Sequence, residues 1–185
     1  MPAAVAFLTT LGMVTSCTSG DDGHVQQPAS SIEPYTDTPT PTPTEPPMPT
    51  YPAAAKVKTP AGAEAAFRHY MNSYNWAFAH ADPQPLIGLT VDGCVFCKSV
   101  RDDLADMQSR SERARGGGVV IHHLMVTPGN IPTEMLLAVN MSQDAGTTLG
   151  ENGKPVASTT AEPARHVDAL MQWVDDRWLL REVSF

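Results

Sequence analysis

The sequence has little positive charge. Its 185 residues include 12 Lys and Arg against 20 Asp and Glu, and the formal net charge is −8. Proteins that bind nucleic acid neutralise phosphates with clustered basic residues. The one basic concentration, Arg110, Arg113 and Arg115, is typical of the solvated end of a helix. Nucleic acid is therefore not expected as a partner.

Long apolar runs and nucleotide or hydrolase motifs are also missing. Ala3 to Val14 is apolar apart from Thr9, Thr10 and Gly12. It is too short to cross about 30 Å of hydrocarbon as a helix, but it has the length of the apolar region of a signal peptide. No later stretch approaches the roughly 18 apolar residues of a spanning helix. The run Gly116-Gly117-Gly118 follows a predicted helix, so we expect it to end that helix and not to bind phosphate.

Cysteine occurs only three times, and the first cysteine, Cys17, follows Val14-Thr15-Ser16. This segment resembles the bacterial lipobox. The resemblance implies that residues 1–16 are a signal peptide, that the thiol of Cys17 receives a diacylglyceryl group with fatty acids such as palmitate, and that Cys17 becomes the first residue. Two or more acyl chains suffice for stable anchoring. We therefore expect an extracytoplasmic protein anchored by lipid to the cell membrane. Basic residues are missing at the start of the chain, which predicts that translation begins further upstream.

Residues 17–57 are predicted to form a lipidated, disordered stalk. They show no helical or strand periodicity, and Thr38 to Pro49 alternates mainly threonine with proline. Proline fixes φ, removes a backbone donor and disfavours the helical region for the preceding residue. The segment is therefore expected to be an extended spacer of the polyproline II type, with a composition that also suits O-glycosylation.

Residues 58–185 are predicted to form one globular domain that begins with helices. Thr59 can cap a helix and Pro60 suits its first turn. Apolar residues then recur at steps of three and four up to Ala81, which predicts an amphipathic helix. A short turn around Leu86 to Leu89 follows. A further helix is expected after it, with Phe96, Val100, Leu104 and Met107 facing inward.

The rest of the domain has the pattern of β-strands. The predicted strands are Val119 to Thr127, Glu134 to Ser142, Arg165 to Val174 and Trp178 to Phe185. Asp144 to Pro163 is expected to be a long loop or an extended hairpin. Because the helices come first and the strands later, an α+β domain is predicted, with helices packed on one face of an antiparallel sheet.

This pattern resembles the nuclear transport factor 2-like superfamily of cone-shaped α+β domains. The resemblance covers Pro60 to Phe185 and rests on the long first helix, the Leu86 to Leu89 turn and the hairpin from Trp173 to Trp178. More narrowly, the lipobox, the Thr/Pro stalk, the opening Thr59 to Ala65 and the Cys-x-x-Cys motif are similar to an uncharacterised family of actinobacterial lipoproteins. The superfamily includes enzymes and non-enzymes, so it implies a fold and no activity.

Cys94 and Cys97 are expected to form a structural disulfide, because paired cysteines of exported proteins are usually oxidised. Two alternatives remain open. A thiol at a helix N-terminus has a lowered pKa, which would suit redox exchange. A zinc site would need two further ligands, for which His122 and His123 are the only adjacent pair.

The candidate pocket residues are Tyr70, Tyr74, His122, His123 and Glu134. Isomerases of the ketosteroid type, which share the fold, place tyrosine and aspartate in the pocket of the cone, and Asp168 is also eligible by residue type. His122 and His123 are neighbours in a strand, so we expect them to point to opposite faces. The methionines are expected to fill the core.

The function predicted from these features is that of a non-catalytic envelope lipoprotein which binds a small apolar ligand or a partner protein. No catalytic residue, cofactor or metal is assigned. The alternatives are an isomerase or cyclase that uses a pocket acid or histidine, and a thiol oxidoreductase that uses Cys94 and Cys97. A homodimer joined through the sheet is expected only by analogy with the superfamily.

Overall fold

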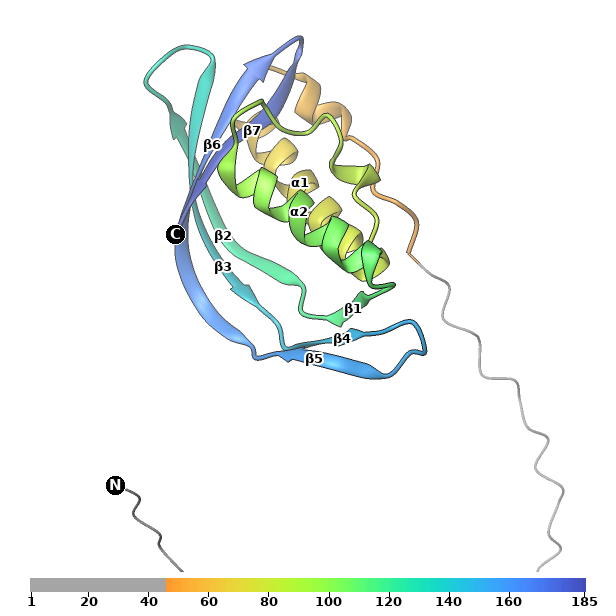
Figure 1. Cartoon of the computed structure of the whole chain (residues 1–185). Helices are drawn as coiled ribbons and strands as arrows, with labels where there is room; N and C mark the ends of the chain where they lie inside the picture. Colours follow the sequence, from red (N-terminus) through yellow and green to blue (C-terminus); the bar gives the residue numbers. More distant parts are fainter. Residues whose placement is uncertain (1–45) are drawn as a thin grey trace, which may run out of the picture. The chain divides into compact units, whose positions relative to one another are not determined.

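The computed structural model describes residues 46–185, which form two helices packed against curved antiparallel sheets (Figure 1). Helix α1 (Pro60–His80) begins as the sequence predicts, because Thr59 Oγ1 accepts a hydrogen bond from Gly62 N at 3.1 Å. The short 3-10 helix η2 (Gln84–Leu86) follows, and then α2 (Val95–Ser109). The predicted α+β fold is confirmed.

The larger sheet has the strand order β2-β3-β6-β7, with every pair antiparallel. Its strands are β2 (Val119–Pro128), β3 (Glu134–Gln143), β6 (Glu162–Val174) and β7 (Arg177–Ser184). The sheet curves around the two helices, which lie on its concave side (Figure 1). This arrangement leaves one face of the sheet for the core and the other face for solvent.

A smaller sheet extends from one end of the larger sheet. It has the order β1-β4-β5, formed by β1 (Arg113–Gly116), β4 (Gly146–Leu149) and β5 (Pro155–Thr159). For residues 144–163 the sequence predicted a long loop or an extended hairpin, and the structure has the hairpin β4–β5. It lies below the ends of the helices in the view of Figure 1.

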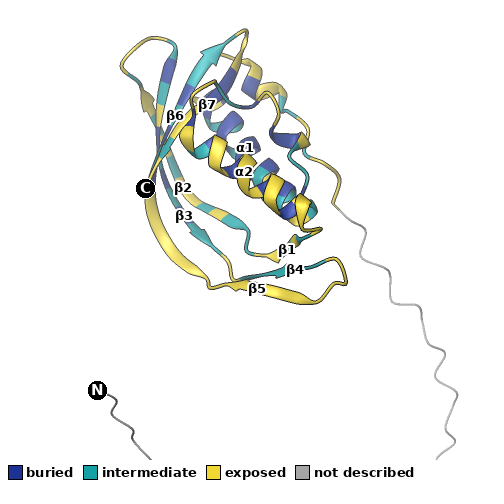
Figure 2. Cartoon of the chain, viewed as in Figure 1, coloured by how far each residue is buried: buried dark blue, intermediate teal, exposed yellow. Residues whose placement is uncertain are grey.

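The core lies between α1, α2 and the concave face of the larger sheet. Along β3, buried Leu137, Val139 and Met141 alternate with residues that face away from the helices, as strand geometry requires. Figure 2 shows this division, with dark blue residues between the layers and yellow ones outside. The largest fully buried side chains are Trp178, Tyr70, Phe67 and Leu104.

The Gly116-Gly117-Gly118 run does not end a helix, contrary to the prediction. Helix α2 ends at Ser109, and the run begins only at Gly116, the last residue of β1. Gly116 and Gly117 have φ of +70° and +73°, a region that glycine enters without steric cost. They turn the chain from the smaller sheet into β2.

Residues 46–58, which we call the strap, pack along α1. Trp76 Nε1 donates to the carbonyl oxygen of Pro46 at 3.0 Å. The hydroxyl of Tyr51 donates to Trp178 O at 2.8 Å, and Trp178 Nε1 donates to Val57 O at 2.9 Å. The packed part of the chain therefore extends to the N-terminal side of Lys58.

Cys17, the predicted signal peptide and most of the Thr/Pro repeat lie outside the described residues. Between residues 46 and 185, no helix combines the length and the apolar character needed to cross a membrane.

Candidate ligand-binding site

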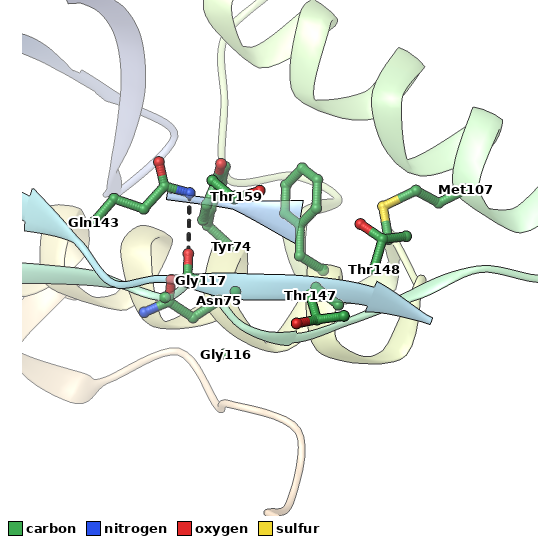
Figure 3. Close-up of a pocket in the computed structure, with 13 residues that line it drawn as sticks. Tyr74, Asn75, Met107, Gly116, Gly117, Gln143, Thr147, Thr148 and Thr159 are labelled. Atoms are coloured by element: carbon green, nitrogen blue, oxygen red, sulfur yellow. Dashed lines mark hydrogen bonds between the residues drawn. The ribbon is translucent and has the colours of Figure 1, made fainter. Parts of the chain in front are cut away.

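Two cavities that share Tyr74 and Gln143 lie between the helices and the sheets. The aromatic cavity, of about 80 Å³, is formed at the concave face of the larger sheet. The polar cavity, of about 180 Å³, lies between the end of α1, the end of α2 and the smaller sheet (Figure 3). The aromatic cavity is lined by Met71, Tyr74, Phe96, Val119, Met141, Ser142, Gln143, Glu162, Pro163, Arg165 and Phe185.

Tyr74 stands at the centre of an aromatic cluster. Its ring centroid lies 4.6 Å from that of Phe78, one helical turn further along α1. The ring of Phe96, from α2, is nearly parallel to Tyr74 at a centroid distance of 6.5 Å, and it also contacts Tyr70 at 6.5 Å. The helical spacing of the tyrosines therefore directs both rings toward α2 and the sheet.

The hydroxyl groups of Tyr70 and Tyr74 have no hydrogen-bond partner among residues 46–185. Burial raises the pKa of both phenols, and the charge of Asp103 adds to the effect on the pKa of Tyr74. Both side chains are therefore neutral at physiological pH and can donate a hydrogen bond.

The floor of the polar cavity is a close crossing of two backbone segments. A Cβ atom on Gly146 would lie 2.7 Å from the Cα and N atoms of Gly117, a distance that side chains do not reach. Gln143 Nε2 donates to Gly117 O at 3.0 Å and holds the crossing from the side, as drawn in Figure 3. The backbone can approach this closely because position 146 is glycine, whereas Gly117 is favoured by its φ of +73°.

Asn75 ties this floor to α1. Its Oδ1 accepts from Val119 N at 2.8 Å, and its Nδ2 donates to Val119 O at 2.9 Å. Both polar atoms of Asn75 are thus used to fix the start of β2, and the residue has a structural role at the edge of the site.

The walls of the polar cavity carry no formally charged side chain. Its lining residues are Tyr74, Asn75, Phe78, Met107, Ala114, Gly116, Gly117, Gly118, Gln143, Gly146, Thr147, Thr148 and Thr159. Charge occurs only at the aromatic cavity, where Arg165 Nη2 lies 3.5 Å from Glu162 Oε2. The guanidinium carbon of Arg165 also lies 4.7 Å from the centre of the Phe185 ring.

Of the candidate pocket residues, only Tyr74 lines the two cavities. Tyr70 is buried in the core and lines neither cavity, and the other three lie away from both. His122 and His123 are exposed, and the β2–β3 register shifts between Ile121 and His123. His123 pairs with Asn140, between the inward-facing Val139 and Met141, and His122 contacts Ser142 Oγ at 2.8 Å. The bulge therefore places both histidines on the outer face, not on opposite faces.

Glu134 is buried, but it lies near the β2–β3 turn and forms an ion pair with Arg181 of β7. Asp168 faces outward and lies 3.0 Å from His166 Nε2. Neither carboxylate lines either of the two cavities.

Cys94 and Cys97 form the predicted disulfide, with their Cα atoms 5.2 Å apart. Cys94 is the N-cap of α2, and its Sγ accepts from Cys97 N at 3.2 Å. The two residues are only 4% and 1% exposed, so a partner thiol has little access to the bond. In the described part of the chain, no three His, Cys, Asp or Glu side chains gather as metal ligands would.

Sequence reasoning missed Gln143, Thr148 and Thr159. They come from β3, β4 and β5, and only the pairing of these strands brings them to Tyr74. The sequence offered one signal near these residues, the glycines at 116 to 118 and at 146. That Gly116 pairs with Gly146 is seen only in the structure.

Comparisons with solved structures show the fold alone, because the sequence identities are low. The intermembrane space region of the chloroplast protein ARC6 is similar with a TM-score of 0.50 and 15% identity, over 68% of this chain and 95% of that chain. A putative aromatic ring hydroxylase from Novosphingobium aromaticivorans gives a TM-score of 0.45 and 12% identity, over 69% and 91%. An uncharacterised protein with a cystatin-like fold from Caulobacter vibrioides gives 0.39 and 13%, over 66% and 87%.

A comparison with curated proteins gives no match. Residues 25–184 match the model of one sequence family, and the chain therefore belongs to this family, described as "Family of unknown function (DUF6318)".

Proposed function

We propose that this chain is a cell-envelope lipoprotein whose α+β domain binds a small apolar ligand in the aromatic cavity. The observation that carries the proposal is that Tyr74 and the nearly parallel ring of Phe96 line this cavity beside Met71 and Met141. Apolar and aromatic walls with few polar groups are the usual lining of ligand pockets. The cavity favours a small ligand over a partner protein as the bound species.

The ligand site can be tested by calorimetric titration with benzene, an uncharged apolar probe of a single ring, which suits a cavity of about 80 Å³. Val119→Phe would fill the aromatic cavity, because Val119 lines it from β2. Val120→Phe is the matched control, since Val120 is exposed and points to the opposite face. The wild-type full chain and Val120→Phe are expected to bind the probe, and Val119→Phe to bind it at least about tenfold more weakly.

Circular dichroism on both variants checks that they fold. Equal binding by a folded Val119→Phe variant would contradict the assignment of the site. No binding by the wild-type chain would contradict the proposed function.

The anchoring part of the proposal rests on Val14-Thr15-Ser16-Cys17 alone. Cys17→Ser removes the thiol that would be lipidated, and it should move the protein from the membrane fraction to the soluble fraction or block its processing. Thr18→Ser is a control that leaves the thiol in place. If the Cys17→Ser variant is processed normally and stays in the membrane fraction, the lipoprotein proposal is wrong.

A further inference from the structure

The polar cavity offers hydrogen-bonding groups that the protein itself does not use. No residue between 46 and 185 forms a hydrogen bond with the hydroxyl of Tyr74, Thr148 or Thr159. Gln143 donates through Nε2 to Gly117 O, and its Oε1 has no donor among the same residues. Each hydroxyl can both donate and accept, whereas an amide oxygen accepts. The cavity therefore presents three hydroxyls and one acceptor to a bound molecule.

Strand register places the two threonines on the cavity side of the smaller sheet. Thr148 pairs with Ala114 of β1, and Thr159 pairs with Gly146, two residues before Thr148. Side chains two residues apart on a strand share a face, so Thr148 and Thr159 lie on the same side. Figure 3 shows Met107 of α2 directed toward Thr148. Gly146 contributes no side chain and leaves the space between them open.

The charge of the cavity restricts the chemistry of its ligand. None of the 13 lining residues is Asp, Glu, Lys, Arg or His. A phosphate, carboxylate or ammonium group would lose hydration there without gaining a counter-charge, which is costly. A neutral group with several hydroxyls loses less hydration free energy. It can also replace its hydrogen bonds to water by hydrogen bonds to the unused groups of the cavity.

The volume of the polar cavity and its aromatic wall restrict the class of ligand further. About 180 Å³ is below the range of pockets for drug-sized ligands and suits a single ring. Tyr74 and Phe78 form one wall, and the electron-rich face of an aromatic ring attracts the weakly positive C–H groups of a saturated ring. A pyranose combines such a C–H face with hydroxyls at its edge.

We propose that the polar cavity binds a neutral sugar ring and that the whole site accepts an uncharged amphipathic ligand of the glycolipid type. Tyr74 and Gln143 line both cavities, so one molecule can place its sugar in the polar cavity and its apolar part in the aromatic cavity. This inference rests on the proposed function and adds the chemistry of the ligand.

Calorimetric titration of the full chain with octyl β-D-glucoside, below its micelle concentration, tests the proposal. The comparison ligands are 1-octanol, which lacks the ring, octyl phosphate, which is charged, and methyl β-D-glucoside, which lacks the chain. Octyl glucoside should bind about tenfold more tightly than 1-octanol and octyl phosphate, as expected for about two additional neutral hydrogen bonds. It should also bind about tenfold more tightly than methyl glucoside, because its chain buries apolar surface.

The double variant Thr148→Val/Thr159→Val removes two hydroxyls with little change of shape. It should bind octyl glucoside about tenfold more weakly than the wild type while binding 1-octanol equally well. Thr160→Val is the matched control, because Thr160 is exposed, as Thr159 is, but does not line the cavity. Tyr74→Phe, which keeps the ring, provides a second hydroxyl deletion if the double variant is unstable.

The outcomes separate the two proposals. Binding of octanol as tight as that of octyl glucoside, or tighter binding of octyl phosphate, would overturn the sugar proposal and leave the apolar site intact. Equal binding of methyl glucoside would show a site for free sugar and overturn the amphipathic ligand. Failure of all four ligands, together with the benzene probe, would overturn the proposed function itself.

Discussion

Gly62 marks the closest approach between α1 and the strap. A Cβ atom at this position would lie 2.0 Å from Val57 O and 3.1 Å from Trp178 Nε1. These two atoms form the hydrogen bond that holds the end of the strap, at 2.9 Å. A larger residue at position 62 must therefore displace the backbone of the strap.

Gly62→Ala should destabilise the protein, although alanine usually stabilises a helix by about 1 kcal/mol relative to glycine. The free energy lost by displacing the strap is expected to exceed this gain, and the melting temperature should fall by several degrees. Gly118→Ala is the control, because its added Cβ would meet Asn75 at an ordinary 3.7 Å. A higher melting temperature for Gly62→Ala than for the wild type would show that the strap moves aside at little cost in free energy.

His69 should make stability depend on pH. It is 7% exposed, its ring meets Tyr51 edge-on at 5.2 Å, and burial lowers its pKa from the ordinary value of 6.5. Below pH 6.5 the unfolded chain takes up a proton that the folded chain still excludes, so the free energy of unfolding falls as the pH falls toward the folded pKa.

Urea unfolding at pH 7.5 and pH 5 measures this effect. Wild type should lose more stability between the two values than His69→Gln, which does not titrate. An equal loss in both proteins would assign the pH dependence to other groups.

At the scale of elements, the Cys94–Cys97 disulfide fixes the first turn of α2. The closed loop is short, so the chain-entropy model gives only about 2 kcal/mol of stabilisation. Cys94→Ser/Cys97→Ser should lower the free energy of unfolding by about that amount, measured by denaturant titration. Probe binding should persist, because neither cysteine lines a cavity. Loss of probe binding at unchanged stability would instead indicate a role of the sulfur atoms at the site.

The elements that the sequence predicts well are those with local signals. Thr59 and Pro60 mark the start of α1, and alternation marks the long strands. Strand β1 was missed because Arg113 to Gly116 is short and exposed, and only its pairing with β4 makes it a strand. The bulge at His122 was missed for the same reason, since register is a property of two strands.

At the scale of the whole molecule, the aromatic half of the site was more predictable than the polar half. Tyr74 follows from helical spacing, whereas Tyr70, one turn earlier on the same helix, lines neither cavity. Gln143, Thr148 and Thr159 depend on strands that reach Tyr74 only through the folded topology, and no spacing in the chain connects them. His122 and His123 failed as pocket residues because one inserted residue changed the face of the strand.

The outer face of the larger sheet bears on the predicted homodimer, which stays a prediction. Val120, Met125 and Leu136 are exposed on this face. If two copies pair there, sedimentation velocity should show a dimer, and Met125→Lys/Leu136→Lys should convert it to a monomer by placing charge in the interface. Glu64→Lys on α1 serves as a surface-charge control. A monomeric wild type at micromolar concentration would contradict the prediction.

The strap has a mechanical consequence. It runs antiparallel to α1, from Pro46 at Trp76 back to Thr59 at the start of the helix. Tension applied at residue 46 therefore loads Trp76–Pro46 first, then the contacts of Tyr51, and last the hydrogen bond from Trp178 to Val57. Thirteen residues at about 3.3 Å each would release roughly 40 Å of chain before the force reaches the core. A pull is thus expected to break these contacts one after another before it reaches the cavities, which would suit the anchoring proposed for this chain.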